Sequence, residues 1–351
     1  MPTTYAIPDG RVAMACTTYT GTGANASIVN TVNGVSFQPD FVWIKDRSVG
    51  YNHVLQDSVR GATAAAKLSS NQSDAEGSAN LAPYGNVSAF NSNGFSLVSG
   101  SIDSRQTNAS GDAYIGWQWK AGGTAVSNTA GSITSTVSAN TTAGFSVVTL
   151  TAQSSGTGTF GHGLGVAPSM VITKLRASTN AWATWHISIP NTQYLELNTT
   201  NAAQTAASYW NSTSPTSTVV SLGSAWAGAG TMVSYCFAPV AGYSAFGSYT
   251  GNGSTDGPFV YLGFRPRYFL IKRSDSAYDW YIHDTARDTY NTMNKELYPN
   301  TSDAEVSSSR IFDALSNGFK VRDSNAGINA SGGTYIYMAF AENPFKYANA
   351  R

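Results

Sequence analysis

Two acidic–basic pairs are the first candidates for chemistry in this chain. Asp57 precedes Arg60 by three residues, and Asp284 precedes Arg287 by the same spacing. A carboxylate and a guanidinium at this spacing can touch on one helical turn. Such a pair could hold a sugar or an acidic ligand, so we predict a ligand-binding role for all four residues. The alternative, which the spacing leaves open, is a structural ion pair that fastens a crossing loop.

Aromatic residues in the middle of the chain are the second candidates. An aromatic platform can stack against sugar rings or anchor a partner protein. Tyr209 and Trp210 lie in loop-like polar sequence, and we predict that they also bind ligand, although burial in a core is the alternative. The whole group consists of Trp182, Trp185, Tyr209, Trp210 and Trp226.

Patterns typical of catalysis or metal binding are absent from the sequence. It contains no His-Glu-x-x-His or Cys-x-x-Cys spacing and no twelve-residue EF-hand loop. The glycine-rich segment 161–165 is not followed by Lys-Ser/Thr, so it indicates a turn and not a phosphate cradle. The acid pairs Asp74/Glu76 and Asp303/Glu305 are too local to indicate two converging carboxylates. We therefore expect no enzyme, no cofactor and no metal site.

The two acidic–basic pairs recur because the chain repeats itself. Residues 37–47 return as 264–273, and in both copies an aspartate follows the strand lysine by twelve residues. Asn-Gly-Phe and Asn-Ala-Ser-Gly segments recur in the same order further on. A diverged middle copy begins near 166–176 and lacks the Asp-x-x-Arg element. Repetition at a period of about a hundred residues indicates whole domains in tandem.

Each copy is rich in short strand-like runs. Apolar segments of four to eight residues end at Gly, Pro, Asn or Ser, and Asn93-Gly94 and Asn317-Gly318 are typical of hairpin turns. Helical periodicity is weak; 58–67 and 286–296 are the best candidates, and because both follow the Asp-x-x-Arg element we expect either a turn or a short helix there. We predict an all-β chain of three tandem β-sandwich modules, jelly-roll-like, of which the first and third are most alike.

The predicted boundaries follow the repeats and the composition. Segment 122–143 has almost no large apolar residues, so we expect a linker or exposed loop there. The predicted parts are an N-terminal arm (1–13), module 1 (14–121), the Gly/Ser/Thr linker (122–143), module 2 (144–243) and module 3 (244–351).

Composition narrows the possible partners. Lys plus Arg and Asp plus Glu number 20 each, and only 11% of the residues are charged. Without a basic excess we expect no nucleic-acid partner, and without a long apolar run we expect no membrane insertion.

Cys16 and Cys236 lie in apolar runs and are expected to be buried free thiols. Lys45 and Lys272 end core strands, and we expect their head groups to lie in water.

Several segments resemble a known family, the tandem-module virion structural proteins of tailed bacteriophages, many of which are described as tail-fibre-like. The resemblance covers nearly the whole chain. The segments that carry it are 17–23 (TTYTGTG), 162–168 (HGLGVAP), 246–253 (FGSYTGNG), 263–266 (GFRP) and 335–345 (YIYMAFAENPF).

The resemblance implies a non-enzymatic structural protein of the virion. Together with the modular build, low charge and aromatic loops, it favours a tail-associated fibre or adhesion component. We expect a homotrimer that docks on other virion proteins and whose loops contact a host surface glycan. The alternative is a capsid decoration or head-fibre protein with a purely structural role.

Overall fold

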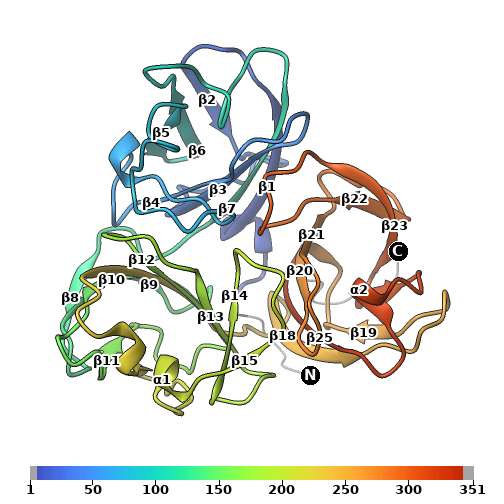
Figure 1. The fold of residues 1–351 in the computed structure, drawn as a ribbon. Helices are drawn as coiled ribbons and strands as arrows, with labels where there is room; N and C mark the ends of the chain where they lie inside the picture. Colours follow the sequence, from blue (N-terminus) through green and yellow to red (C-terminus); the bar gives the residue numbers. More distant parts are fainter. Residues whose placement is uncertain (1–5, 343–351) are drawn as a thin grey trace.

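The computed structural model of the protein describes residues 6–342, which form three lobes around a common centre (Figure 1). Almost all of its regular structure is antiparallel β-sheet, which confirms the predicted all-β multi-module fold. Each lobe, which we call a module, has two sheets. The inner sheet lies next to the centre of the molecule, and an outer sheet with no more strands than the inner one covers the face of the inner sheet that points away from the centre.

Modules 1 and 3 have the same inner-sheet order, β1-β7-β3-β4 and β18-β25-β20-β21. Their outer sheets are β2-β6-β5 and β19-β24-β23-β22. In module 1 the strands are β1 Met14–Thr20, β2 Ala26–Val29, β3 Phe41–Asp46, β4 Val54–Asp57, β5 Asn86–Asn91, β6 Gly94–Val98 and β7 Ala113–Trp119. In module 3 they are β18 Ser244–Thr250, β19 Phe259–Tyr261, β20 Pro266–Arg273, β21 Trp280–Asp284, β22 Met293–Glu296, β23 Val306–Leu315, β24 Gly318–Val321 and β25 Thr334–Ala341.

Module 2 has the same four inner strands, β10-β17-β12-β13, but extends them to eight with β14 and β15 on one side and β9 and β8 on the other. Its outer sheet is the pair β11-β16. The strands are β8 Val126–Asn128, β9 Ser135–Asn140, β10 Phe145–Thr151, β11 Gly158–Gly161, β12 Met170–Leu175, β13 Ala183–His186, β14 Gln193–Glu196, β15 Gln204–Thr205, β16 Val219–Leu222 and β17 Thr231–Phe237.

The segment 122–143 is part of module 2 and not a linker, so that prediction is wrong. It contains β8 and β9, and β9 pairs with β10 from Ser135 opposite Leu150 to Asn140 opposite Phe145. Ser and Thr are compatible with a strand near a sheet edge, where one face meets solvent. Val137 alone supplies a fully buried large apolar side chain from β9, which is why the composition resembled a loop.

Helical structure is confined to short turns in the described residues. These are η1 Gly10–Val12, η2 Ala64–Ala66, η3 Ser224–Trp226, α1 Ala207–Trp210 and α2 Ala326–Asn329. Only η2 falls within the candidate helix 58–67, and the candidate 286–296 ends in strand β22. The Asp-x-x-Arg residues form a tight turn after a strand, so the turn alternative of our prediction holds at both places and only η2 is helical.

Both predicted hairpins are confirmed, with the turn one residue earlier than expected. Asn91 pairs with Gly94 and Leu315 pairs with Gly318, so the two-residue turns are 92–93 and 316–317. The two glycines are needed for another reason: a Cβ atom at Gly94 would lie 2.0 Å from the carbonyl oxygen of Ile28. The outer strands β2 and β19 therefore approach these positions closely.

The inner strands are apolar on both faces because both faces are covered. In β3, Phe41 and Trp43 point to the centre of the molecule, whereas Val42 and Ile44 pack against the outer sheet of module 1. In β20, Tyr268 and Phe269 alternate in the same way. This two-sided burial explains the uninterrupted apolar runs in the sequence.

One aromatic core joins all three modules. Phe41 of module 1 stacks on Tyr235 of module 2 at a ring-centroid distance of 4.3 Å. Trp119 of module 1 meets Tyr268 of module 3 at 5.5 Å, and Phe237 of module 2 meets Phe340 of module 3 at 6.1 Å. Each pair of modules thus shares aromatic contacts around a pseudo-three-fold axis.

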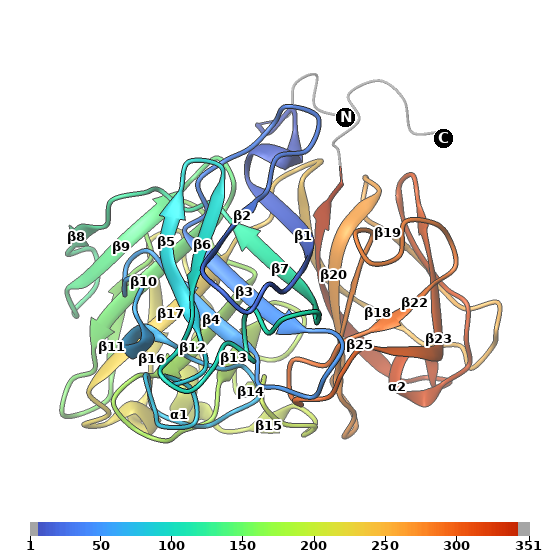
Figure 2. The same cartoon turned by 90° about the horizontal axis from the view of Figure 1, so that it is seen from above.

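The beginning and end of the described chain meet at one end of the molecule (Figure 2). Gly10 in η1 lies beside the carbonyl oxygen of Ala341, and the Ala341 N–H donates to the Tyr243 carbonyl at 2.7 Å. Ile7, in the predicted arm 1–13, is only 2% exposed and packs on the axial core. Residues 1–5 of that arm lie outside the described residues.

Candidate functional site

Asp57 and Arg60 meet, as their spacing predicted, but they do so at the interface between modules 1 and 2. Arg60 Nε donates to Asp57 Oδ2 at 2.6 Å, and Arg60 Nη1 donates to Glu76 Oε1 at 2.6 Å. From module 2, Tyr235 donates to Asp57 Oδ2 at 2.8 Å, and Arg176 Nε donates to Glu76 Oε2 at 2.7 Å. The pair is therefore the centre of a cross-module network.

Asp284 and Arg287 build the matching network between modules 3 and 1. Arg287 Nε donates to Asp284 Oδ2 at 2.6 Å and Nη1 donates to Glu305 Oε2 at 3.1 Å. From module 1, Trp117 Nε1 donates to Asp284 at 3.0 Å, while Arg47 forms two hydrogen bonds with Glu305, of 2.8 and 2.9 Å. An aspartate, two arginines and a glutamate thus occupy matching places at the two interfaces, whereas the aromatic donor to the aspartate is Tyr235 at one and Trp117 at the other.

A short turn explains why each aspartate and arginine meet locally. Asp57 Oδ1 accepts from the backbone N–H groups of Val59 and Arg60, and Asp284 Oδ1 accepts from Ala286 and Arg287. The aspartate side chain therefore caps the turn and leaves Oδ2 for the guanidinium. The spacing encodes this turn directly.

Burial excludes these four side chains from contact with a soluble ligand. The side chains of Asp57, Arg60, Asp284 and Arg287 are all 0% exposed. Burial by itself would raise the pKa of Asp284, but the Arg287 charge and the Trp117 hydrogen bond lower it below its usual value. The structure therefore corrects our ligand-binding prediction for these residues in favour of the structural alternative.

The third interface, between modules 2 and 3, lacks this network. His186 stands at the repeat position of Asp57, and Ile189 stands at that of Arg60. His186 Nδ1 accepts from the Ser188 N–H at 3.1 Å, so its other nitrogen carries the hydrogen and donates to the Tyr337 carbonyl at 3.1 Å. Burial lowers the pKa of His186 to about 4, so the ring is neutral.

A backbone hydrogen bond occurs at all three interfaces despite this difference. The donor N–H and acceptor carbonyl pairs are Glu76 to Arg176, Glu305 to Arg47, and Ala203 to Ser274, at 2.8–2.9 Å. The Glu–Arg ion pair of two interfaces is thus replaced by Ala203 and Ser274 at the third. Side-chain chemistry differs there while the backbone geometry is kept.

A ring of side-chain hydrogen bonds closes the assembly. Each donor lies eight residues after a strand lysine, and each reaches a backbone carbonyl of the neighbouring module. The pairs are His53 Nε2 to Tyr298, Trp182 Nε1 to Ser69, and Trp280 Nε1 to Glu196, at 3.0, 2.8 and 3.0 Å. Because module 1 reaches module 3, module 2 reaches module 1 and module 3 reaches module 2, the ring has one cyclic direction.

The strand lysines support the same loops from inside, contrary to our expectation. Lys45, Lys174 and Lys272 are all buried, and each ammonium group donates to the carbonyl of the last strand residue and to a carbonyl of the loop that follows. Burial lowers the pKa of each to about 8. Their head groups therefore do not lie in water.

The aromatic candidates of module 2 are mainly core residues. Trp210 is 1% exposed and packs with Trp226 between the two sheets of module 2. Tyr209 is half-buried and stacks on Tyr194 at 3.8 Å between ring centroids. The structure thus favours the core alternative for Trp210, and Tyr209 keeps only a partly exposed edge.

The structure also places the two cysteines. Cys16 and Cys236 are buried free thiols, as predicted. Among residues 6–342, no group of three or more His, Cys, Asp or Glu side chains could hold a metal ion. No helix in that range is long and apolar enough to cross a membrane.

An open polar groove lies on module 1, which the sequence analysis did not predict. Two hollows of about 250 and 540 Å³ share Tyr51 and Arg105, and we call them together the tyrosine groove. Tyr51 comes from the β3–β4 loop, Tyr84 from the β4–β5 loop and Arg105 from the β6–β7 loop. Ser302 of module 3 completes one wall, so the groove borders the interface between modules 1 and 3.

Arg105 lies between the two tyrosines. Its guanidinium is 4.6 Å from the Tyr84 ring centroid and 5.5 Å from that of Tyr51. Asp103 fixes the position of this guanidinium, because Arg105 Nε donates to Asp103 Oδ2 at 2.7 Å. The hydrogen bond from Arg105 lowers the pKa of Asp103, so the pair stays charged and balances itself.

A buried lysine fixes the floor of the groove. Lys67 Nζ donates to the carbonyls of Leu81 and Gly85 and to Gln106 Oε1, at 2.5–2.8 Å. It therefore ties the loop that carries Tyr84 to the loop that carries Arg105. Amide side chains of Asn52, Gln72 and Asn80 line the same hollow.

Sequence reasoning missed this groove because three distant loops build it. Its only local signal is a tyrosine in polar sequence, as at 49–52, and such tyrosines are common in this chain. Tyr209 and Trp210 had the same kind of signal and turned out to be largely packed. The distinction depends on tertiary contacts that the spacing does not contain.

One family model matches the chain over residues 13–344, and its description is "Domain of unknown function (DUF7483)". The chain belongs to this family. The match includes strands of all three modules, so in this chain the DUF7483 domain corresponds to the three modules together and not to a single repeat. A search of the curated proteins found no match to the chain.

We predict that Arg287→Met lowers the free energy of unfolding by about 3–5 kcal/mol, because Asp284 is then buried without its cation. Arg287→Lys keeps a charge and should lose less. Arg322→Met is the matched control: its ion pair with Asp313 is 42% exposed at the arginine, so the expected loss is below about 1 kcal/mol. Urea denaturation measures all three, and a loss as small as that of the control in Arg287→Met would contradict the structural role.

The buried histidines predict acid sensitivity. Folding lowers the pKa of His186 from an ordinary value near 6.5 to about 4. The contribution of His186 to the free energy of unfolding is therefore full above about pH 6.5. It is then lost as the pH falls toward 4, by about 1.4 kcal/mol per pH unit inside that window. His186→Asn retains an acceptor for Ser188 and should remove one proton from the slope of stability against pH. An unchanged slope would show that His186 is not the titrating group.

Proposed function

We propose that the protein is a non-enzymatic structural component of a tailed-bacteriophage particle, associated with the tail, which contacts host surface glycan through the tyrosine groove. The observation that carries the glycan contact is the pair of partly exposed tyrosines on either side of Arg105, above a floor of amide side chains. The virion setting rests on the resemblance of the five sequence segments to phage structural proteins.

The chemistry of the groove suits a neutral sugar. Tyrosine rings offer flat apolar faces with a polar edge, and the amide groups of Asn52 and Gln72 can both donate and accept hydrogen bonds. Arg105 is balanced by Asp103, so the side chains that line the two hollows have no net charge to select an acidic ligand. The two hollows, which share Tyr51, provide room for more than one sugar ring.

The open shape of the groove favours weak binding. A shallow site buries little ligand surface, so single contacts would be of low affinity and many copies on one particle would supply strength. The predicted homotrimer remains part of this proposal. The ring of three modules inside one chain means that a three-fold core does not itself require three chains.

The groove proposal predicts that Tyr51→Ala and Tyr84→Ala each weaken glycan binding about tenfold, because each removes one aromatic face. The measurement is binding to a printed array of neutral and acidic bacterial oligosaccharides. Tyr290→Ala is the matched control, since Tyr290 is 83% exposed and lies outside the groove. Equal binding by Tyr51→Ala and the control would rule out the groove as the glycan site.

The tail location predicts the position of the protein in the particle. Gold-labelled antibody against module 3 should decorate the tail or its fibres in electron micrographs of intact phage that carry this protein. Gold spread over the head would replace the tail proposal with capsid decoration, the alternative stated above. Particles without any label would refute the virion proposal itself.

A further inference from the structure

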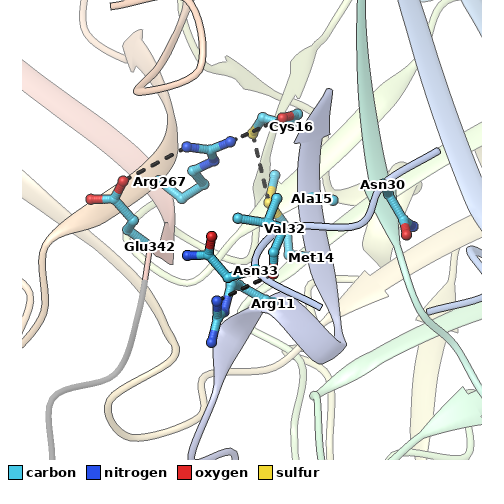
Figure 3. A pocket seen from close by; sticks show the side chains of 9 residues that line it. All are labelled: Arg11, Met14, Ala15, Cys16, Asn30, Val32, Asn33, Arg267 and Glu342. Carbon is cyan, nitrogen blue, oxygen red and sulfur yellow. Dashed lines mark hydrogen bonds and ion pairs between the residues drawn. The ribbon is translucent and has the colours of Figure 1, made fainter. Parts of the chain in front are cut away.

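A second cavity lies between modules 1 and 3, away from the tyrosine groove, at the end of the molecule where η1 meets β25 (Figure 3). Its volume is about 150 Å³. Arg11 of η1, Cys16 of β1 and Asn33 of the β2–β3 loop line one side, and Arg267 of β20 and Glu342 line the other.

Arg267 carries the charge of this cavity. Its guanidinium is anchored mainly by neutral acceptors, because Nη2 donates to the Cys16 carbonyl at 3.0 Å and Nη1 to Thr285 Oγ1 at 3.3 Å. The nearest carboxylate, Glu342, is 3.7 Å away and forms its shorter bond, of 2.7 Å, with Arg265. Two arginines thus share one carboxylate.

Arg11 adds a second guanidinium at the mouth. It is paired with Asp9 at 2.8 Å, and its Nη1 also reaches the Val32 carbonyl at 3.3 Å. Counting Arg11, Arg265 and Arg267 against Asp9 and Glu342 gives three positive and two negative groups. The described surroundings of the cavity therefore have a net charge of plus one.

Arg267 also departs from the internal repeat. At the matching position, after the repeated proline, module 1 has Asp40 and module 2 has Ser169. Asp40 is buried and satisfied within its own module by Ser58 and the Ala121 N–H. A partly exposed arginine here, with its side chain 21% exposed, is not required by the fold that the three modules share.

We propose that this cavity binds a small organic carboxylate. The fork of Arg267 matches a carboxylate in shape and charge, and Figure 3 places the Asn33 amide on the same cavity as a further donor. Met14, Ala15 and Val32 supply an apolar wall for a short carbon chain. The volume limits the bound group to a few heavy atoms, which favours short organic acids over extended chains.

The test is saturation-transfer NMR of the whole protein with sodium propionate as the probe at constant ionic strength. With the wild-type protein, saturation should transfer to the propionate methyl group, and titration of that signal should give a dissociation constant of about 1 mM. Arg267→Met should weaken binding at least about tenfold. Because Arg267 also bridges two modules, Asn33→Gly is the second variant: the φ of Asn33 is 50°, which glycine adopts readily, and only the amide is lost.

Arg322→Met, which removes an exposed arginine outside the cavity, should bind propionate as wild type does. Equal signals from wild type, Arg267→Met and Asn33→Gly would overturn the proposal, as would the absence of any methyl signal with wild type. Competition by inorganic phosphate that is stronger than by acetate would overturn the assignment of a carboxylate. None of these outcomes bears on the tyrosine groove.

Discussion

Burial of aromatic side chains on the pseudo-three-fold axis is the constraint on which the rest of the structure depends. A single sandwich module would expose the axial face of its inner sheet, including residues such as Phe41 and Tyr268 that are at most 2% exposed here. Only the other two modules cover that face. Apolar burial on this scale is the main favourable contribution to folding, so the three modules stabilise one another.

The polar contacts at the rim then fix how the modules are oriented. Apolar packing has little directional preference, whereas buried ion pairs and hydrogen bonds require one geometry. The networks of Asp57 and Asp284 select partners at two interfaces, and His186 does so at the third with a neutral hydrogen bond. The Arg267 cavity, by contrast, lies where the modules differ, because the residues that match Arg267 are Asp40 and Ser169.

The sequence revealed the modules because their repeats are local, but it did not reveal the sites. The Asp57–Arg60 contact is encoded by a three-residue spacing and was predicted, whereas its partner Tyr235 is 178 residues away and was not. The strands of 122–143 were missed because their stability comes from pairing with β10 and not from their own apolar residues. The tyrosine groove and the Arg267 cavity both depend on loops that meet only in the folded chain.

Differential scanning calorimetry of the intact chain tests the shared axial core most directly. If the three modules are one cooperative unit, a single transition should appear, with a calorimetric enthalpy equal to the van't Hoff enthalpy. Two or three separable transitions, each with the enthalpy of one module, would contradict the account, because the modules would then be stable without the common core.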